Sequence, residues 1–274
     1  MNVIIPMAGS GQRFVDAGYK DPKPLIKVRG KRIIEYILDM FDRENDDFTF
    51  ICNNRHLADN IHMREILQGY VKKSQVIAIP PHKYGPVYTI HTSMFLIPQD
   101  EPVIIAHCDT PLGWDYEDFK QYVGEVDADG CIVSHTGFHP HTLSKTMMAY
   151  SKTAGDRVLE VKEKACYTNN RFEEHASSGV YYFKKGSYVT HYFSEAIDQD
   201  INYNGEYYVT LVYNLLIENN LKVYSYVHDY VMSLGTPSDL QNYEAWQRIL
   251  DGDQAKNEED MFNCYNYWKY FKQC

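Results

Sequence analysis

Short apolar runs rich in β-branched residues recur through the first half of the chain. These runs lie at 2–5, 48–52, 75–79, 103–107 and 130–134. They are nearly continuous in hydrophobicity and are bounded by Pro, Gly, Asn or Asp, which is typical of strands buried on both faces of a parallel sheet. Between them, helical spacing joins Ile33, Ile34, Ile37, Leu38 and Phe41, and likewise Val87, Ile90, Met94 and Phe95. The alternation predicts right-handed βαβ units, and hence an α/β fold with an open, doubly wound sheet.

The pattern changes after about residue 135. Tyr-rich alternating runs at 147–150, 179–183 and 222–231 predict antiparallel strands added to the sheet. Helical stretches follow at 206–219, 238–250 and 257–272. The last of these is unusually aromatic, so it either packs against the chain's own body or forms a homodimer interface or a wall of the substrate site. We therefore expect a mixed sheet followed by C-terminal helices.

Composition excludes several classes of protein. The chain has 274 residues, 44% of them hydrophobic and 23% charged, which is typical of a globular protein. Its net charge of -10 argues against a broad nucleic-acid surface, because phosphate neutralisation needs a basic face. No apolar run approaches the roughly 20 residues of a membrane-spanning helix, and the N-terminus lacks the basic region of a signal peptide. Six cysteines without a CxxC pair indicate free thiols in a reducing compartment, so we expect a cytoplasmic protein.

The opening of the chain has the most distinctive chemistry. The first predicted strand leads into the glycine-rich turn Ala8-Gly9-Ser10-Gly11. Glycines let backbone N–H groups approach phosphate oxygens closely. Arg13 follows two residues later, and Lys23 lies between two prolines, so two cations accompany the turn. The spacing fits neither the dinucleotide-binding fingerprint nor the P-loop.

Taken together, residues 4–42 resemble the N-terminal motif of the sugar-phosphate nucleotidyltransferases, also called nucleotide-sugar pyrophosphorylases. The family pattern is x-A-G-x-G-x-R-[FL], then P-K-x-[LM], then G-[KR]-P-[IL]-[IL]. The last element departs from it, because Arg32 stands where the family often has proline. The resemblance implies a Rossmann-like, glycosyltransferase-A-like sheet and the reaction of an NTP with a sugar 1-phosphate, which gives an NDP-sugar and pyrophosphate. It also implies Mg²⁺.

The same resemblance implies roles for the opening residues. Ala8, Gly9, Ser10 and Gly11 would bind the nucleotide, with the glycines and Arg13 on the triphosphate. Lys23 would stabilise the charge on the α-phosphate as it is attacked. Arg13 and Lys23 are therefore the predicted catalytic residues.

Two further segments of the first half are similar to family motifs. Gly85 lies in a stretch that resembles the glycine-containing helix start beside the base, although a plain helix N-terminus fits as well. Asp109 follows the strand at 103–107 and resembles the aspartate that ligates Mg²⁺, a hard cation that prefers carboxylate oxygen. Ligands bind at such strand ends in open α/β sheets. The alternative for Asp109 is a helix cap for residues 115–123.

The second half supplies candidate residues for the acceptor. Residues 158–164 resemble the V-x-x-[IV]-x-E-K-P element, with Ala165 in place of the proline. By this resemblance, Glu163 would accept sugar hydroxyls and Lys164 would neutralise the acceptor phosphate. The alternative is an exposed strand of mixed charge. Gly179 lies in a segment similar to the family's strand beside the acceptor, and Glu206 in one similar to the start of a helix behind the site.

The segment 233–240 resembles the family's W-x-D-x-G-T-P-x-D-L ending, with one departure. Ser233 stands where many members have a second metal-binding aspartate. Serine is a poor ligand for Mg²⁺, so either Asp229, the nearest carboxylate in sequence, or water would complete the site. The second metal ligand stays open.

A histidine-rich segment at 134–141 admits three interpretations. It could be a transition-metal site, although no nearby carboxylate or cysteine completes a ligand set. It could be a surface loop. We expect a loop over the acceptor pocket, in which His139 donates to a hydroxyl or phosphate group.

The resemblance covers about residues 1–246, which we expect to be a nucleotidyltransferase domain. Within it, 1–134 would bind the nucleotide and 135–246 the acceptor, and 247–274 would be a helical extension. The predicted function is transfer of NMP from an NTP, with CTP slightly favoured over UTP or dTTP, to a sugar or polyol phosphate for surface polysaccharide. One alternative is a glycosyltransferase that uses an NDP-sugar, although His107-Cys108-Asp109 is not the usual Asp-x-Asp motif. The other is a non-catalytic nucleotide-binding regulatory module.

Overall fold

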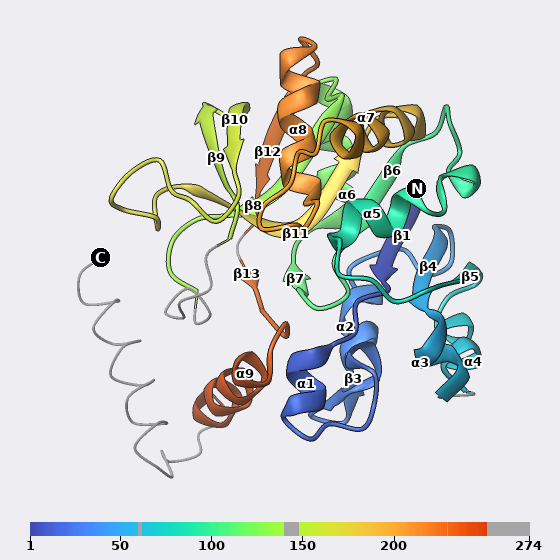
Figure 1. Cartoon of the computed structure of the whole chain (residues 1–274). Coiled ribbons are helices and arrows are strands. Elements are labelled where there is room, and N and C mark those ends of the chain that lie inside the picture. The colour runs from blue at the N-terminus through green and yellow to red at the C-terminus, as the bar shows by residue number, and fades with distance from the viewer. Residues whose placement is uncertain (60–61, 140–147, 229, 251–274) are drawn as a thin grey trace.

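A computed structural model describes residues 1–59, 62–139, 148–228 and 230–250 (Figure 1). Its centre is a nine-stranded mixed sheet with the strand order β5-β4-β1-β6-β11-β8-β12-β10-β9. The strands are β1 (Asn2–Met7), β4 (Asp47–Asn53), β5 (Lys73–Ile79), β6 (Val103–Ala106), β8 (Gly130–His135), β9 (Tyr150–Ala154), β10 (Arg157–Lys162), β11 (His175–Phe183) and β12 (Val223–Val227). The predicted Rossmann-like α/β fold is confirmed.

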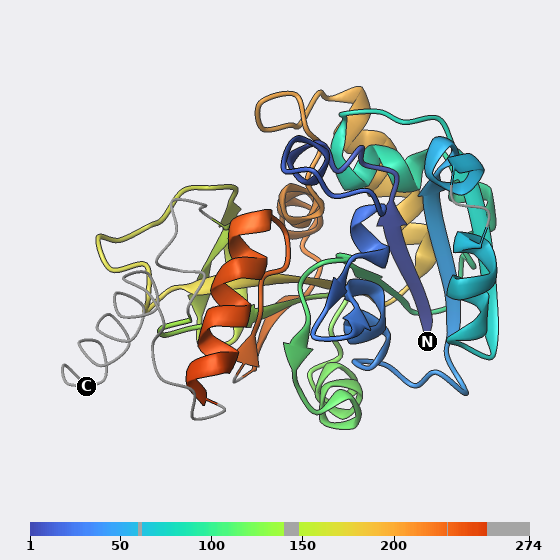
Figure 2. The ribbon, with the colours of Figure 1, turned by 90° about the horizontal axis from the view of Figure 1, so that it is seen from below.

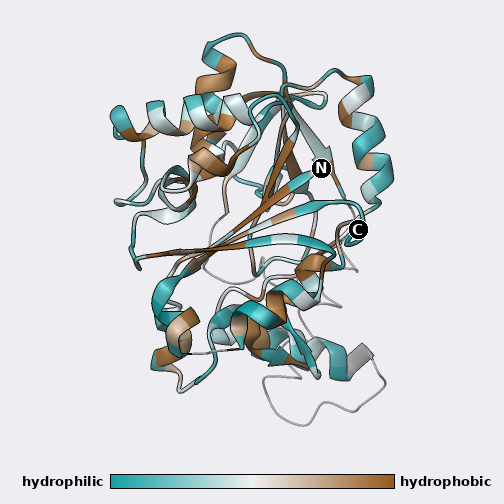
Figure 3. Ribbon diagram, turned by 90° about the vertical axis from the view of Figure 1, so that its right-hand side faces the viewer, coloured by the Kyte–Doolittle hydropathy of each residue, from teal (hydrophilic) through white to brown (hydrophobic). Residues whose placement is uncertain are grey.

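Helices cover both faces of this sheet (Figure 2). One face packs against α2 (Ile33–Leu38), α4 (Met63–Gly69) and α6 (Tyr116–Glu125). The other packs against α5 (Gly85–His91), α7 (Gly186–Asp198) and α8 (Val209–Glu218). Because side chains alternate along a strand, Val3 and Ile5 enter the first core while Ile4 enters the second. Figure 3 shows hydrophobic residues concentrated along the central strands.

The strand directions confirm the first half of the prediction and correct one part of the second. Strands β5, β4, β1 and β6 are parallel, and β11 is antiparallel to both β6 and β8. We expected β12 to be antiparallel to its neighbours; it is antiparallel to β10 but runs parallel to β8. The parallel pairing of β12 with β8 follows from the connection between β11 and β12. Phe183 at the end of β11 and Val223 at the start of β12 both pair with Gly130, so α7 and α8 return the chain to the end of the sheet that it had left.

Three predicted elements differ in extent. The helix expected to include Phe95 ends at His91, and Phe95 lies in the short 3₁₀ helix η2 (Met94–Leu96), where it is 82% exposed. The run at 222–231 divides into β12 and β13 (Tyr230–Val231), which pairs outside the main sheet with β7 (Leu112–Gly113). The strand expected at 147–150 is β9, which begins at Tyr150.

A third apolar cluster joins the beginning of the chain to its last described helix. It contains Phe14, Ile26, Val28, Ile33, Met232, Leu234 and Leu240. The first four belong to or adjoin α1 (Gln12–Asp16), β2 (Lys27–Val28), β3 (Lys31–Arg32) and α2, and Leu240 belongs to α9 (Pro237–Leu250), the helix predicted at 238–250. Figure 1 shows α9 beside α1 and β3. This packing fixes the segment 232–240 next to the glycine-rich turn. The helix predicted at 257–272 lies outside the described residues.

Candidate active site

A cleft lies at the carboxyl ends of β1, β4, β5 and β6, where ligands bind in open α/β sheets. It has a volume of about 450 Å³. Eight predicted site residues line it: Ala8, Gly9, Ser10, Gly11, Lys23, Gly85, Asp109 and Glu206. The fold thus brings together residues that are up to 198 positions apart in the chain.

The glycine-rich turn forms one wall of the cleft. Gly11 has a φ of 62°, in the left-handed region that glycine adopts without strain, and it directly precedes α1. Nothing lies within 4 Å of the position that a Cβ on Gly9 would occupy. The backbone of the turn is therefore open to a ligand in the cleft.

Lys23 and Asp109 form an ion pair across the cleft, although 86 residues separate them in the chain. Lys23 is held between Pro22 and Pro24 in the 3₁₀ helix η1 (Lys23–Leu25), and Asp109 follows β6. Burial opposes ionisation of Asp109, but the charges of Lys23 and His107 outweigh it and lower the pKa of Asp109 to about 2. Burial likewise lowers the pKa of Lys23, but the charge and hydrogen bond of Asp109, together with the neighbouring Cys108 and Asp239, raise it by more. Both groups are therefore charged at neutral pH.

The alternative role for Asp109, a helix cap, is not what the structure shows. Helix α6 is capped by Asp115, whose carboxylate accepts hydrogen bonds from the N–H groups of Glu117 and Asp118 at 3.0 Å. Asp109 therefore stays available to the cleft.

Gly85 lies where the two halves of the chain meet. A Cβ on this residue would be 2.8 Å from the carbonyl oxygen of Tyr207, and its φ of 84° is left-handed. Two backbone hydrogen bonds join the same segments: Val87 N–H donates to Tyr207 O (3.2 Å), and Tyr207 N–H donates to Tyr84 O (2.9 Å). Only glycine fits here, because any side chain would separate the two segments.

A hydrogen-bond circuit fixes the turn before Gly85. The N–H of Tyr84 donates to His82 Nδ1 at 3.1 Å, so the imidazole proton resides on Nε2. That nitrogen then donates to Thr89 Oγ1 at 3.0 Å, and the Thr89 hydroxyl donates to Gly85 O at 3.2 Å. Burial lowers the pKa of His82, which is consistent with a neutral ring.

The predicted acceptor residues form a second cluster beside the cleft. Lys164 Nζ donates to the hydroxyl of Tyr208 at 2.7 Å, and that hydroxyl donates to Glu206 Oε2 at 3.1 Å. Thr210 donates to Glu163 Oε2 at 2.6 Å, and burial raises the pKa of Glu163. Glu206 lines the cavity, whereas Glu163 and Lys164 do not.

Gly179 lies against His107, a residue that lines the cleft. A Cβ at this position would be 2.8 Å from Nδ1 of His107, and the His107 N–H donates to Gly179 O at 2.8 Å. The glycine therefore allows β11 to approach the end of β6. His107 itself lines the cavity, and burial lowers its pKa.

Arg13 and His139, like Glu163, Lys164 and Gly179, do not line the cleft. Arg13 is exposed on α1, near enough to Tyr208 for its charge to lower the pKa of that phenol, although burial raises it more. His139 is buried, with its ring centroid 4.5 Å from that of His135. Their functional roles stay predictions. Asp229 and His141 lie outside the described residues.

The metal interpretation of the histidine segment has no support in the described ranges, where no three His, Cys, Asp or Glu side chains are grouped so as to hold a metal ion. Ser178 instead contacts two of the buried rings: its hydroxyl is 2.9 Å from His135 Nδ1 and 2.8 Å from His228 Nε2.

Several cleft residues were not predicted from the sequence. They are His56, His82, Lys83, Thr89, His107 and Cys108. Three of them follow the predicted strands at 48–52, 75–79 and 103–107 within a few residues, so the rule that ligands bind at carboxyl ends would have found His56, His82 and His107.

Comparison with known proteins identifies the family. The model of the MobA-like NTP transferase domain matches residues 3–174. No curated protein sequence matches the chain. Across the described part of the chain, no helix is both long and apolar enough to cross a membrane.

Solved structures share the fold at low sequence identity. A nucleoside-diphosphate-sugar pyrophosphorylase from Vibrio cholerae RC9 superposes with a TM-score of 0.70 at 21% identity, covering 88% of this chain and 99% of that one. The UTP-bound UGPase from Acinetobacter baumannii gives 0.65 at 12% identity, covering 90% and 93%. The inositol-1-phosphate CTP transferase from T. maritima gives 0.64 at 13% identity, covering 92% and 97%. The chain belongs to the MobA-like NTP transferase domain family and is a nucleotidyltransferase.

Proposed function

We propose that this protein transfers NMP from an NTP to a sugar or polyol phosphate and releases pyrophosphate. The observation that supports it most is the convergence of the glycine-rich turn, Lys23 and Asp109 on one cleft. A flexible, side-chain-free backbone and a fixed cation suit a triphosphate. A carboxylate opposite them suits the metal that accompanies such a ligand.

The donor set of the cleft fits Mg²⁺. Asp109 is ionised and faces the cavity, and Mg²⁺ in such sites takes one or two carboxylates together with phosphate oxygens and waters. Asp109 would therefore hold the ion. When bound, Mg²⁺ supplies positive charge to the phosphate oxygens.

The chain's own residues would position the reactants and stabilise charge. A phosphate oxygen of the acceptor attacks the α-phosphorus of the NTP; a new P–O bond forms, the bond to the bridging oxygen of the β-phosphate breaks, and pyrophosphate leaves with that bond's electron pair. No proton transfer is required if the acceptor phosphate is ionised. Lys23 would stabilise the charge on the α-phosphate, and the turn at 8–11 would hold the triphosphate in line.

We assign the acceptor to the second half of the domain, residues 135–246, and the nucleotide to residues 1–134. Glu206 faces the cavity, and the hydroxyl of Tyr208 connects it with Lys164. This arrangement offers a carboxylate for hydroxyl groups beside an ammonium for the acceptor phosphate. Arg13, exposed on α1 near Tyr208, is our second proposed cation for the triphosphate.

CTP is our slightly favoured nucleotide, and a precursor of surface polysaccharide our favoured product. The T. maritima neighbour is named for CTP and the A. baumannii neighbour for UTP, at nearly equal TM-scores. The shared fold therefore supports either pyrimidine nucleotide, and the choice is left to the assay.

The test is pyrophosphate release in the presence of Mg²⁺, from CTP, UTP, dTTP, ATP and GTP, each combined with a panel of sugar and polyol phosphates. We expect release with one preferred pair. Release of free nucleoside diphosphate from an NDP-sugar would instead support the glycosyltransferase alternative. NTP binding without turnover across the panel would support the non-catalytic module.

A further inference from the structure

The segment 233–239 places a second carboxylate beside Asp109. The point of reference for the distances is the position that a Cβ on Gly235 would occupy. Asp109 Oδ2 is 3.4 Å from that point, Asp239 Oδ2 is 3.5 Å from it and Ser233 Oγ is 3.6 Å from it. Three oxygen atoms, one from Asp109 and two from the segment 233–239, therefore lie close to the backbone of Gly235, which has no side chain to separate them.

This arrangement is fixed by backbone and side-chain contacts. The N–H of Leu234 donates to Asp109 O at 2.8 Å, and Ser233 Oγ donates to Asp239 Oδ2 at 3.1 Å. Leu234 also belongs to the apolar cluster that joins the segment to α1 and β2. Asp239 is 9% exposed, in the first turn of α9. The oxygens are thus held by the fold rather than placed by mobile surface side chains.

The charges of the cluster do not balance. Asp109 and Asp239 carry two negative charges when ionised, and Lys23, which pairs with Asp109, supplies one positive charge. Two partly buried carboxylates that share one ammonium are expected to attract another cation, because an unpaired charge away from water is costly.

We propose that Asp239 is the second carboxylate of the divalent-cation site, and that Ser233 positions it there. In the family pattern this carboxylate comes from the position of Ser233 itself; in this chain it comes from six residues further on, through the hydroxyl that Ser233 donates. This inference rests on the proposed function, since it concerns the metal that Asp109 would hold in the cleft. Ser233 and Asp239 line a smaller hollow, beside Met232 and Tyr243, and not the cleft itself.

The geometry suits a partly hydrated ion. Direct Mg–O bonds measure about 2.0–2.1 Å, and Mg²⁺ usually keeps several waters in protein sites. Asp109 Oδ2 and Asp239 Oδ2 both lie within 3.5 Å of the Cβ position of Gly235, so they are less than about 7 Å from each other, which suits an ion that keeps some of its waters. Two carboxylates and a hydroxyl leave the remaining positions to water and to phosphate oxygens.

The test is binding of Mn²⁺, a paramagnetic substitute for Mg²⁺, to the full chain, measured from the electron paramagnetic resonance signal of free Mn²⁺. We expect Asp239→Asn to weaken binding on the order of tenfold. The amide oxygen of asparagine still accepts from Ser233, so the fold is retained. The matched control is Asp198→Asn, which removes one exposed carboxylate at the end of α7, away from the cleft lining, and should leave Mn²⁺ binding unchanged.

Gly235→Ala probes the same group of oxygens without touching a charge. Its Cβ would meet the three oxygens at ordinary contact distances of 3.4–3.6 Å, so folding should be unaffected, but the methyl group would occupy the space beside them. We expect a loss of Mn²⁺ affinity similar to that of Asp239→Asn. Introducing Ser233→Asp into the Asp239→Asn variant should restore binding, because it returns a carboxylate to the segment.

Mn²⁺ affinity of Asp239→Asn equal to that of the unmodified chain, or an equal loss in Asp198→Asn, would overturn the proposal. The two proposals fail separately. Pyrophosphate release together with unchanged Mn²⁺ affinity in Asp239→Asn would leave the function standing and remove this site. Mn²⁺ binding that depends on Asp239, without any pyrophosphate release, would support this metal site and contradict the proposed function.

Discussion

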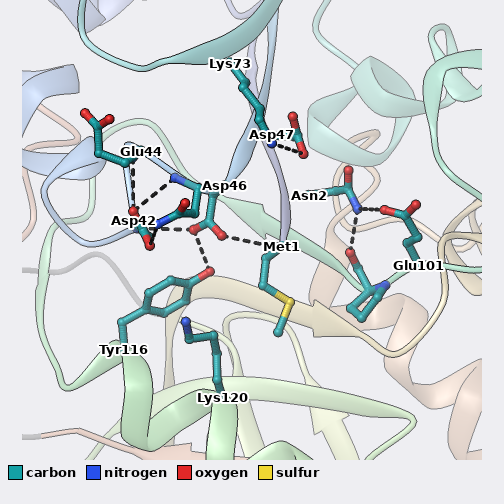
Figure 4. A network of polar contacts seen from close by, with 12 residues as sticks. Met1, Asn2, Asp42, Glu44, Asp46, Asp47, Lys73, Glu101, Tyr116 and Lys120 are labelled. Carbon is teal, nitrogen blue, oxygen red and sulfur yellow. Dashed lines mark hydrogen bonds and ion pairs between the residues drawn. The ribbon is translucent and has the colours of Figure 1, made fainter.

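The two ends of the central sheet use charged groups in opposite ways. At the amino ends of β1 and β4, Asp46 is 3% exposed and its carboxylate has a partner on every side (Figure 4). Its Oδ1 accepts from the N-terminal ammonium of Met1 at 2.9 Å, and its Oδ2 accepts from Tyr116 at 2.8 Å and from the Asp42 N–H at 3.2 Å. At the carboxyl ends, Asp109 and Asp239 share Lys23.

This difference separates a structural network from a functional one. The charges at the amino end satisfy one another, and they tie the first residue of the chain to the loop before β4 and to α6. The charges at the carboxyl end face a cavity and leave donors and acceptors for a ligand. We therefore expect substitutions at the amino end to change stability and those at the cleft to change activity.

The largest expected effect is on activity. Lys23→Ala should lower pyrophosphate release by about 10²–10³-fold, because it removes the cation at the charge that develops on the α-phosphate, a loss of about 2.7–4 kcal/mol. Circular dichroism would verify that the variant is folded. The matched control is Lys73→Ala, which removes an exposed lysine at the amino end and should leave the rate unchanged. Near-normal turnover of the Lys23→Ala variant would show that Lys23 is not a catalytic residue.

The next effect is on stability. Asp46→Asn should lower the free energy of unfolding by about 1.5–3 kcal/mol, since it weakens the hydrogen bonds that a buried carboxylate accepts from a partly buried ammonium and a partly buried phenol. Urea unfolding measures it. Asp47→Asn is the control, because its ion pair with Lys73 is exposed and should contribute no more than about 1 kcal/mol. Equal stability of the two variants would contradict the distinction between the networks, as would a loss of turnover in folded Asp46→Asn.

A smaller effect should appear at the contact between the two halves. Gly205→Ala forces alanine into a left-handed conformation, with a φ of 79° and open space around it, which costs about 1–2 kcal/mol. Gly85→Ala, with a φ of 84°, adds a contact 2.8 Å from Tyr207 O, so it should cost more and should also raise the KM for the NTP. Equal unfolding free energies for the two variants would show that the close contact between Gly85 and Tyr207 does not contribute to the cost of the substitution.

The smallest effect concerns Glu163, whose pKa is raised by burial. A carboxyl group with a raised pKa favours folding while it is protonated, and that contribution disappears as the pH rises through its folded pKa. Glu163→Gln should therefore gain stability relative to the unmodified chain as the pH rises above 4.5, the ordinary pKa of glutamate. Urea unfolding at several pH values would show the difference in unfolding free energy between the variant and the unmodified chain widening as the pH rises. A difference that narrows would contradict the prediction.

Much of the framework follows from local patterns. The runs at 2–5, 48–52, 75–79, 103–107 and 130–134 became β1, β4, β5, β6 and β8, because a strand buried on both faces needs continuous apolar residues. The glycine-rich turn, Lys23 and Asp109 were also placed correctly at one cleft, because parallel strands end at the same edge of the sheet.

The remaining features depend on contacts between distant segments. The direction of β12 is set by the length and return of two helices, which the Tyr-rich alternation of 222–231 does not encode. The position of Asp239 beside Asp109 requires the packing of Leu234 and Leu240 against α1 and β2. Likewise, the burial of His139 depends on His135 in β8, so a polar segment became part of the interior.

The two backbone hydrogen bonds between Tyr207 and the segment 84–87 have a consequence for how binding of one substrate affects binding of the other. They join the residue next to Glu206, on the proposed acceptor side, to the turn at Gly85, on the proposed nucleotide side. A ligand that orders one of these segments also orders the other, so the second ligand meets a wall that is already arranged. Linkage makes such an effect reciprocal: each substrate would raise the affinity for the other by the same factor. The cleft would then favour a ternary complex over either partly filled state.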